Sequence, residues 1–254
     1  MSLDVSSGGA VSNVSTTLSD LSGQSAVAYA TSGARFSPSI SQGGVSFGQT
    51  FASTNVDQTA TNDSVRVYKV TRSDNSVDEF DLLIPGEPTQ GLSYVTYGQW
   101  NSPNGSSQNL NFGTVVFGIQ TSAGDMPTTG TATYDGATLG TLIIGSTFYN
   151  VGGYIELDAD FSTGNVTGST LLMSKQNVQT GGVSAWRDLD FNATIAPASN
   201  RFSGSAASSD SSVTGVVAGG FFGPVSNGSP PEIGGGWRVS GSNESAVGGF
   251  VGKR

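Results

Sequence analysis

Strict alternation of apolar and polar residues is the feature of this sequence that most limits its possible folds. Tyr154–Phe161 reads YIELDADF and places Ile155, Leu157, Ala159 and Phe161 on one face and acidic residues on the other. A period of two is typical of a β-strand with one buried face. No amphipathic helix pattern longer than about ten residues follows Ser64. Short strand-like runs separated by turn residues continue to the C-terminus, so we predict an all-β chain with helix below about a tenth of its residues.

Glycine is placed inside many of these strands. The chain has 37 glycines among 254 residues, about twice the usual share. In Val216–Gly236, VVAGGFFGPVSNGSPPEIGGG, glycines stand next to large apolar residues. Such glycines are expected where a strand bends or another group approaches its backbone, and closing a small barrel requires both. We therefore predict an antiparallel barrel or sandwich in which Gly219 and Gly235 face large neighbours, and in which Phe221 and Phe222 point to opposite sides.

The charge of the chain limits its partners. The net charge is −9, the isoelectric point is near 4.2 and only 11% of the residues are charged. Binding to nucleic acid depends largely on Lys and Arg, and the ten cations of this chain form no stripe. We therefore predict no nucleic-acid partner, and the same charge disfavours an anionic membrane surface.

The residue types needed for most catalytic sites are missing. The chain has no histidine and no cysteine, which excludes a Ser-His-Asp triad, thiol catalysis and zinc sites built from His or Cys. The carboxylate pairs Asp158/Asp160 and Asp188/Asp190 are two residues apart, so each pair lies on one face, which we interpret as a solvated exterior. We predict that the protein is not an enzyme and has no catalytic residues.

One acidic stretch raises the question of a metal. Residues 73–81 read SDNSVDEFD and lack the spacing of an EF-hand loop. Oxygen ligands on such a turn could hold calcium weakly, but a solvated hairpin turn is the simpler interpretation. No metal site is predicted.

The chain divides by composition into two parts. Residues 1–60 are rich in Ser, Gly, Ala and Thr, and strand-like runs rich in Val, Tyr and Phe follow between Val65 and Trp100. From Asn109 onward, strand patterns alternate with glycine-bearing turns. We predict a smaller β region over residues 1–108 and a barrel over residues 109–254.

Three motifs in the second part resemble one protein family. MPTTGTATYDG at 126–136 is similar to the P-T-x-G-x-A-x-Y-x-G opening of the barrel of transferrin-binding-protein-B-like proteins. NRFSGSA at 200–206 resembles the N-x-F-x-G-x-A strand of that family. GGFFGPVSNGSPPEIGGGW at 219–237 and GGFVGKR at 248–254 resemble its C-terminal motifs. The resemblance covers residues 109–254, and VTYGQW in the first part is similar to the strand that leads into such barrels.

This resemblance implies a fold, a location and a class of function. It implies an eight-stranded antiparallel barrel preceded by a β-rich handle-like domain, in an exported bacterial surface or secreted protein. Members bind host proteins or haem, so we expect a binding protein in iron or haem acquisition or host-protein binding. The resemblance also raises an outer-membrane receptor as a further partner. The alternative is a structural or adhesive surface protein with no small ligand. We expect a monomer.

The family is usually anchored through an N-terminal lipidated cysteine. This chain has no cysteine, so lipidation stays open. The N-terminus, MSLDVSSGGAVSNV, has neither a basic start nor an apolar core. We expect that a signal peptide is absent from this sequence because it was trimmed.

Haem is the cofactor that the resemblance raises. Without histidine, its axial ligand would be a tyrosine or a methionine. The candidate tyrosines are Tyr94, Tyr97, Tyr134, Tyr149 and Tyr154. Recognition of a protein partner is expected on loops. The candidate loops are Asn101–Gln108, Lys175–Ser184 and Val225–Pro231.

Overall fold

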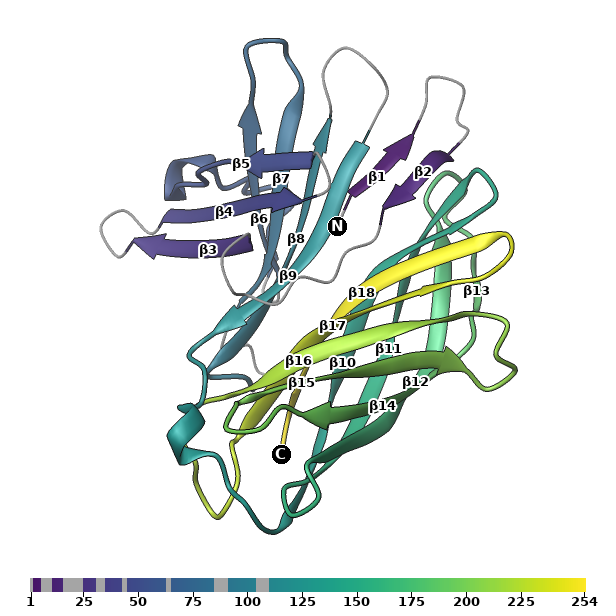
Figure 1. The fold of residues 1–254 in the computed structure, drawn as a ribbon. Helices are drawn as coiled ribbons and strands as arrows, with labels where there is room; N and C mark the ends of the chain where they lie inside the picture. The colour runs from purple at the N-terminus through teal and green to yellow at the C-terminus, as the bar shows by residue number, and fades with distance from the viewer. Residues whose placement is uncertain are drawn as a thin grey trace. The chain divides into compact units, whose positions relative to one another are not determined.

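A computed structural model describes residues 2–5, 11–15, 25–30, 35–42, 45–62, 65–84, 91–103 and 110–254 (Figure 1). The chain forms two compact units. One, which we name the N-terminal unit, consists of Met1–Ile84 and Gly98–Val115, and the other, the barrel unit, consists of Pro85–Tyr97 and Val116–Arg254. The predicted boundary at residue 108 lies outside the described residues. Apart from the 3₁₀ turns η1 (Ser53–Asn55) and η2 (Ala123–Asp125), every element of the described chain is a strand, which confirms the predicted all-β class.

The strands of the N-terminal unit form three sheets. A two-stranded sheet contains β1 (Ser2–Val5) and β2 (Val11–Ser15), and a three-stranded sheet contains β3 (Ser25–Ala30), β4 (Arg35–Gln42) and β5 (Val45–Gly48). The third sheet contains β6 (Val65–Thr71), β7 (Val77–Leu83), β8 (Val95–Pro103) and β9 (Leu110–Gly118), in that order. The buried core of the N-terminal unit contains Phe51, Tyr68 and Phe80, and the ring centroids of Phe51 and Phe80 lie 5.4 Å apart.

The barrel unit is one closed antiparallel sheet. Its strands are β10 (Thr131–Ile144), β11 (Thr147–Asp160), β12 (Asn165–Asn177), β13 (Val183–Ala185), β14 (Leu189–Ile195), β15 (Arg201–Ser208), β16 (Thr214–Phe222), β17 (Glu232–Ser240) and β18 (Glu244–Lys253). The order is β11-β10-β18-β17-β16-β15-β14-β12-β13, and pairing of β11 with β12 closes the ring. β13 is a short strand paired only with β12, so the ring itself has the eight strands that the family resemblance implied.

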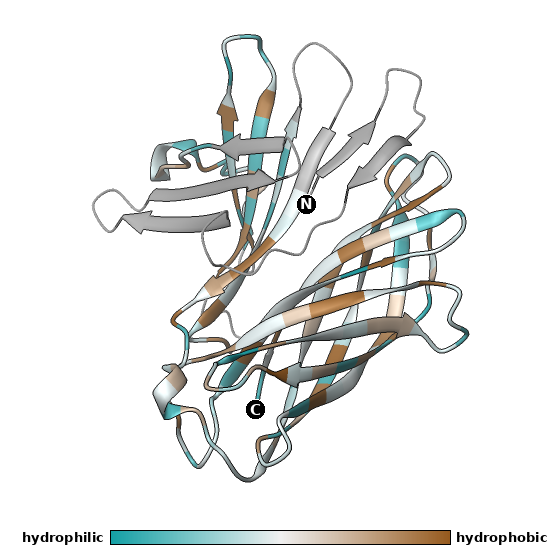
Figure 2. Cartoon of the chain, in the orientation of Figure 1, coloured by the Kyte–Doolittle hydropathy of each residue, from teal (hydrophilic) through white to brown (hydrophobic). Residues whose placement is uncertain are grey.

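Aromatic side chains fill the interior of the barrel. An eight-stranded barrel is just wide enough for its own side chains, and hydrophobic residues alternate with hydrophilic ones along its strands (Figure 2). The ring of Phe221 lies 5.9 Å from Tyr134, 5.6 Å from Phe161 and 5.6 Å from Phe202, between centroids. The four residues predicted to face inward from YIELDADF are all buried in the same core. The barrel is therefore a packed core.

Glycines make room for these rings, as predicted. A Cβ atom placed on Gly219 would lie 2.5 Å from Phe202 Cζ, and one on Gly235 would lie 2.7 Å from Phe250 Cζ. Phe221 points inward, whereas Phe222 is buried on the outer face, where it lies beside Gly234 with Val95. The alternation of the two phenylalanines is confirmed.

No helix in the described part of the chain has the length and apolar character that a membrane-spanning helix requires.

Candidate functional site: the rim of the barrel

Four connections meet at one end of the barrel because alternate turns of an antiparallel ring lie at the same end. They are residues 145–146, 178–182, 209–213 and 241–243, which we name the rim. The Gly145 amide donates to the Asn243 carbonyl at 3.0 Å and so joins two of these turns. Binding residues are often found on loops held by a rigid scaffold. The predicted loop Lys175–Ser184 lies at this end.

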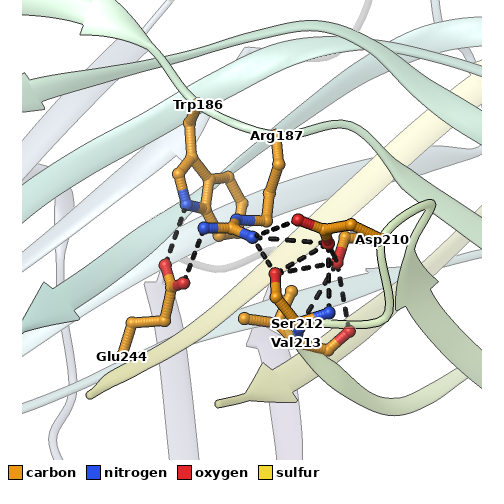
Figure 3. Close-up of polar contacts among 7 residues, drawn as sticks. Trp186, Arg187, Asp210, Ser212, Val213 and Glu244 are labelled. Atoms are coloured by element: carbon orange, nitrogen blue, oxygen red, sulfur yellow. Dashed lines mark hydrogen bonds and ion pairs between the residues drawn. The ribbon is translucent and has the colours of Figure 1, made fainter. Parts of the chain in front are cut away.

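Arg187 ties the segment after β13 to the β15–β16 turn of the rim and to the start of β18 (Figure 3). It follows β13, and its Nη2 lies 2.8 Å from Glu244 Oε1 at the start of β18. Its Nη1 lies 3.3 Å from Asp210 Oδ2 in the β15–β16 turn and also donates to Ser212 Oγ. A guanidinium group presents several donors in a fixed plane, which suits it to joining carboxylates from different elements.

Asp210 holds the β15–β16 turn in its shape. Its Oδ1 accepts hydrogen bonds from Ser208 Oγ at 2.6 Å and from the amide and hydroxyl of Ser212 at 3.0 and 2.7 Å. These bonds, with Ser208 first and Ser212 next, hold the pKa of the exposed Asp210 carboxyl well below its usual range. The carboxylate is therefore ionised, and it interacts with the donors of the turn and with Arg187.

A pair of tryptophans lies beneath this network. Trp186 stacks on Trp237 with ring centroids 6.1 Å apart and an interplanar angle of 26°. Its Nε1 donates to Glu244 Oε2 at 3.3 Å, and its backbone amide donates to the Met173 carbonyl at 2.8 Å. Glu244 thus receives bonds from both Trp186 and Arg187, so the rim is anchored to the aromatic core.

The loop between β12 and β13 presents apolar side chains to solvent. Val178 is 55% exposed and Val183 is 66% exposed, and the residues between them are polar or glycine. Arg187 is paired with both Asp210 and Glu244, although its buried Nε has no hydrogen-bond partner among the described residues. The rim is therefore suited to contact with another surface through a few apolar and polar groups on a fixed frame.

The predicted loop Val225–Pro231 lies at the opposite end of the barrel and is largely occupied by internal contacts. The Tyr134 hydroxyl donates to the Pro230 carbonyl at 2.9 Å. Arg254 Nη1 donates to the Ser226 and Asn227 carbonyls at 3.1 and 3.3 Å and to the buried Ser229 hydroxyl. These contacts close the barrel at this end. The third predicted loop, Asn101–Gln108, lies mostly outside the described residues.

Three of the five candidate tyrosines are engaged by neighbours. Tyr134 is fully buried, and burial raises the pKa of its hydroxyl well above the usual value. Tyr97 is buried and donates to the Leu139 carbonyl at 3.3 Å. Tyr94 packs against Gly223, where a Cβ atom would lie 2.5 Å from its ring.

The other two candidates lie on opposite faces of β11. Tyr149 packs against the barrel core, and Lys175 Nζ lies 5.4 Å from the centroid of its ring. Tyr154 points outward and is 63% exposed. The five tyrosines thus occupy separate environments, and Tyr154 is the most exposed of them. Haem ligation by any of them stays a prediction.

The acidic stretch at residues 73–81 does not converge on a metal site. Asp74 Oδ1 accepts bonds from the Ser76 amide and hydroxyl at 3.0 and 2.6 Å, which forms a local turn. Asp78 is buried and pairs with Arg72 at 2.6 Å, and Glu79 pairs with Lys69 at 3.3 Å. Within the described ranges, no group of three acidic side chains is placed to hold a metal ion.

The buried carboxylate of Glu232, whose role the sequence did not reveal, holds residues 93–95 beside β17 on the outside of the barrel. Glu232 Oε1 accepts from the Ser93 amide at 2.6 Å, and Oε2 accepts from the Tyr94 and Val95 amides at 2.7 and 2.8 Å. The glutamate is 3% exposed. It belongs to the EIGGGW motif, and its role becomes visible only when residues 93–95 are brought beside β17.

The family model of the C-lobe and N-lobe beta barrels of Tf-binding protein B matches residues 126–254. The structure of intact Ap-TbpB, with its N and C lobes, is similar over 99% of this chain and 45% of that protein, at 18% identity and a TM-score of 0.54. A variant of the vaccine antigen transferrin-binding protein B from Haemophilus parasuis is similar over 100% of this chain and 44% of that one, at 19% identity and a TM-score of 0.53. This chain thus spans less than half the length of each of these two proteins. The similarity shows a shared fold.

A comparison with curated protein sequences found no match. The family model nevertheless covers more than half of the chain and begins at the first of the three motifs described above. On these grounds the chain belongs to the transferrin-binding-protein-B-like β-barrel family.

Proposed function

We propose that this protein is an exported bacterial surface or secreted protein that binds a host protein through the rim of its barrel and serves iron or haem acquisition without catalysing a reaction. The similar solved structures are transferrin-binding proteins by name. A transferrin is accordingly the first partner to test. A further membrane receptor and a monomeric state belong to the same proposal.

The observation that supports this proposal most is the combination of a fixed frame and exposed apolar groups at the rim. Arg187 and Glu244 hold the neighbouring segments in place, and the loop itself is held by the Val178 amide, which donates to the Phe148 carbonyl at 3.1 Å, and by the Gly181 amide, which donates to the Asn177 carbonyl at 2.8 Å. The loop therefore loses little conformational entropy when it binds. Val178 and Val183 are exposed beside polar residues. Apolar side chains that lose contact with water on binding are typical of the centre of a protein–protein interface.

Surface plasmon resonance with immobilised protein and mammalian serum transferrins in solution tests the proposal. We expect saturable binding that a Val178→Ser/Val183→Ser double variant weakens about tenfold or more, because the two side chains lose their buried apolar area. A Val77→Ser variant is the matched control, since Val77 is 36% exposed in the N-terminal unit. Absence of binding to every transferrin tested would contradict a transferrin partner.

Haem is the second candidate ligand, favoured by the exposure of Tyr154, which is 63% exposed. Titration of the protein with haem should then give a tyrosinate-type absorbance spectrum that a Tyr154→Phe variant loses. With no histidine in the chain, that binding should not change near pH 6, where a histidine ligand would titrate. A protein that binds neither transferrin nor haem would favour the structural or adhesive alternative.

A further inference from the structure

Four exposed apolar side chains stand together on the outer wall of the barrel, away from the rim loop. They are Leu139 on β10, Tyr154 on β11, and Leu171 and Leu172 on β12, and we name them the wall patch. Their exposed fractions are 45%, 63%, 41% and 79%. Tyr154 is directly opposite Leu171, and Leu139 is opposite Gly152, two residues from Tyr154 on the same face. These neighbours form one surface across three strands.

The backbone at the wall patch carries a strained residue. The register of β11 and β12 shifts between Gly152 and Tyr154, which marks a β-bulge. Leu172 has a φ of 55°, in the left-handed region that a bulky residue rarely adopts. The chain thus keeps a leucine in a costly conformation and exposes it to water. Bulges often redirect a side chain near a functional site, and such strain is a reason to look for a function.

Carboxylates border the wall patch on the same face. Moving along β11 from Tyr154, Glu156 and Asp158 follow at intervals of two residues, and Asp135 lies opposite Glu156. Lys253 is opposite Asp135 on β18, but no ion pair joins them. In the described part of the chain no cation pairs with these three carboxylates. A partner that covers the leucines would therefore gain from lysine or arginine at its own border.

This charge disfavours two other occupants. Contact between the wall patches of two copies would bring the same carboxylates toward one another, which is unfavourable when no cation balances them. Residues 1–47 contain Asp4, Asp20 and Arg35 as their charged residues, so they offer a single cation to the acidic border. Neither a second copy nor the start of the chain complements this surface.

We propose that the wall patch is a second interaction surface, which binds a protein segment whose apolar residues are flanked by lysine or arginine. Leu171, Leu172 and Tyr154 supply the apolar contact, and Glu156 and Asp158 select the basic partner. The proposal goes beyond the function of the rim and does not depend on which molecule the rim binds.

Methyl-detected NMR on the whole chain tests this proposal with two synthetic peptides, acetyl-KLKFKLK-amide and acetyl-ELEFELE-amide. At low salt we expect the basic peptide to shift the methyl signals of Leu139, Leu171 and Leu172, and to bind about tenfold or more tightly than the acidic peptide. Shifts confined to other sites, equal affinities for the two peptides, or no binding would each overturn the proposal. So would sedimentation showing that the protein dimerises and that Leu172→Ser abolishes the dimer.

Variants separate a binding role from a structural one. Leu172→Ser should weaken binding of the basic peptide about tenfold. Val178→Ser removes an exposed apolar side chain at the rim instead, and it should leave the affinity unchanged. A Glu156→Lys/Asp158→Lys double variant should reverse the preference and favour the acidic peptide, a gain that loss of folding cannot produce. Failure of this reversal in a variant with a normal circular dichroism spectrum would overturn the assigned role of the carboxylates. Transferrin binding at the rim should be unaffected by all these wall variants.

Discussion

Arg187 Nη2 and Glu244 Oε1 lie 2.8 Å apart at the rim and connect the segment after β13 with the first residue of β18. Arg187 also reaches Asp210, so one side chain joins three connections that are distant in the sequence. Glu244 in turn accepts from Trp186 Nε1, which couples the surface network to the stacked tryptophans. The shape of the rim depends on this small set of contacts.

Replacing Arg187 with Ala should lower the free energy of unfolding by about 1 kcal/mol, because partly exposed ion pairs contribute little even in a network. Hydrogen exchange should become faster in residues 209–213, because Asp210 loses its partner, and in residues 241–243, because Glu244, whose carbonyl accepts from the Gly241 amide at 2.8 Å, loses its partner too. Arg66→Ala is the control, because Arg66 is exposed and forms no ion pair in the part of the chain that the structure describes. Unchanged exchange in the two turns would show that they do not need Arg187.

Replacing Glu232 with Gln should lower the free energy of unfolding of the barrel by about 3 kcal/mol, because an amide cannot accept all three backbone bonds and the site is buried. A denaturant melt measures the change. The matched variant Glu156→Gln alters an exposed glutamate on the barrel wall and should stay within about 0.5 kcal/mol. Equal effects of the two variants would mean that the bonds from residues 93–95 add nothing to stability.

Replacing Gly235 with Val should overpack the barrel and lower its free energy of unfolding by about 3 kcal/mol. Even a Cβ atom there would lie 2.4 Å from the Ala218 carbonyl oxygen and 2.7 Å from Phe250. At Gly182, in the rim loop, a Cβ atom would meet only Thr180 Oγ1 at 3.5 Å. Gly182→Val is therefore the control, with an expected change within about 0.5 kcal/mol. A barrel that tolerated both valines equally would not be closed as described.

Asp81 makes the N-terminal unit sensitive to pH. Burial, assisted by the nearby charge of Glu79, raises the pKa of its carboxyl to about 6. The folded state therefore binds a proton more tightly than the unfolded state, whose pKa is about 3.9, so stability falls as the pH rises from about 4 to about 6. Asp81→Asn should raise the unfolding midpoint at pH 7 and make no difference below about pH 4.

Asp74→Asn is a control of opposite sign for this pH dependence. Hydrogen bonds from Ser76 lower the pKa of the Asp74 carboxyl, so its contribution to stability is present above its unfolded pKa and lost as the pH falls through the folded one. This variant should lose a little stability at neutral pH. Thermal melts of both variants from about pH 2 to about pH 8 distinguish the two carboxyls, and parallel curves would refute the assignment of Asp81.

The sequence predicted those features that depend on local patterns. Alternation in YIELDADF correctly placed Ile155 and Leu157 inside, and the neighbours Phe221 and Phe222 point to opposite faces because successive strand residues always do. The close approach of Phe250 to Gly235 was also expected, since a glycine within a strand near large apolar residues indicates such packing.

The remaining features depend on contacts between distant residues. Glu232 binds the amide of Tyr94 across 138 positions, and Trp186 binds Glu244 across 58. Such pairs depend on the order and the register of the strands. A local sequence pattern specifies neither of these. The same limit holds for the candidate loop Val225–Pro231: the sequence does not reveal that Ser226, Asn227 and Gly228 are exposed, whereas Ser229 is buried and accepts from the C-terminal Arg254. The left-handed conformation of Leu172 could not be predicted either, because leucine rarely adopts that conformation and its residue type does not indicate it.

Hydrogen exchange of the whole chain with and without saturating serum transferrin tests the central claim most directly, because it maps a bound partner without any substitution. The account predicts slower exchange in residues 177–185 on binding, with little change in residues 225–231 at the opposite end. Protection of residues 225–231 with none at 177–185, or no protection anywhere with any transferrin, would contradict the claim that the rim binds a host protein of this class.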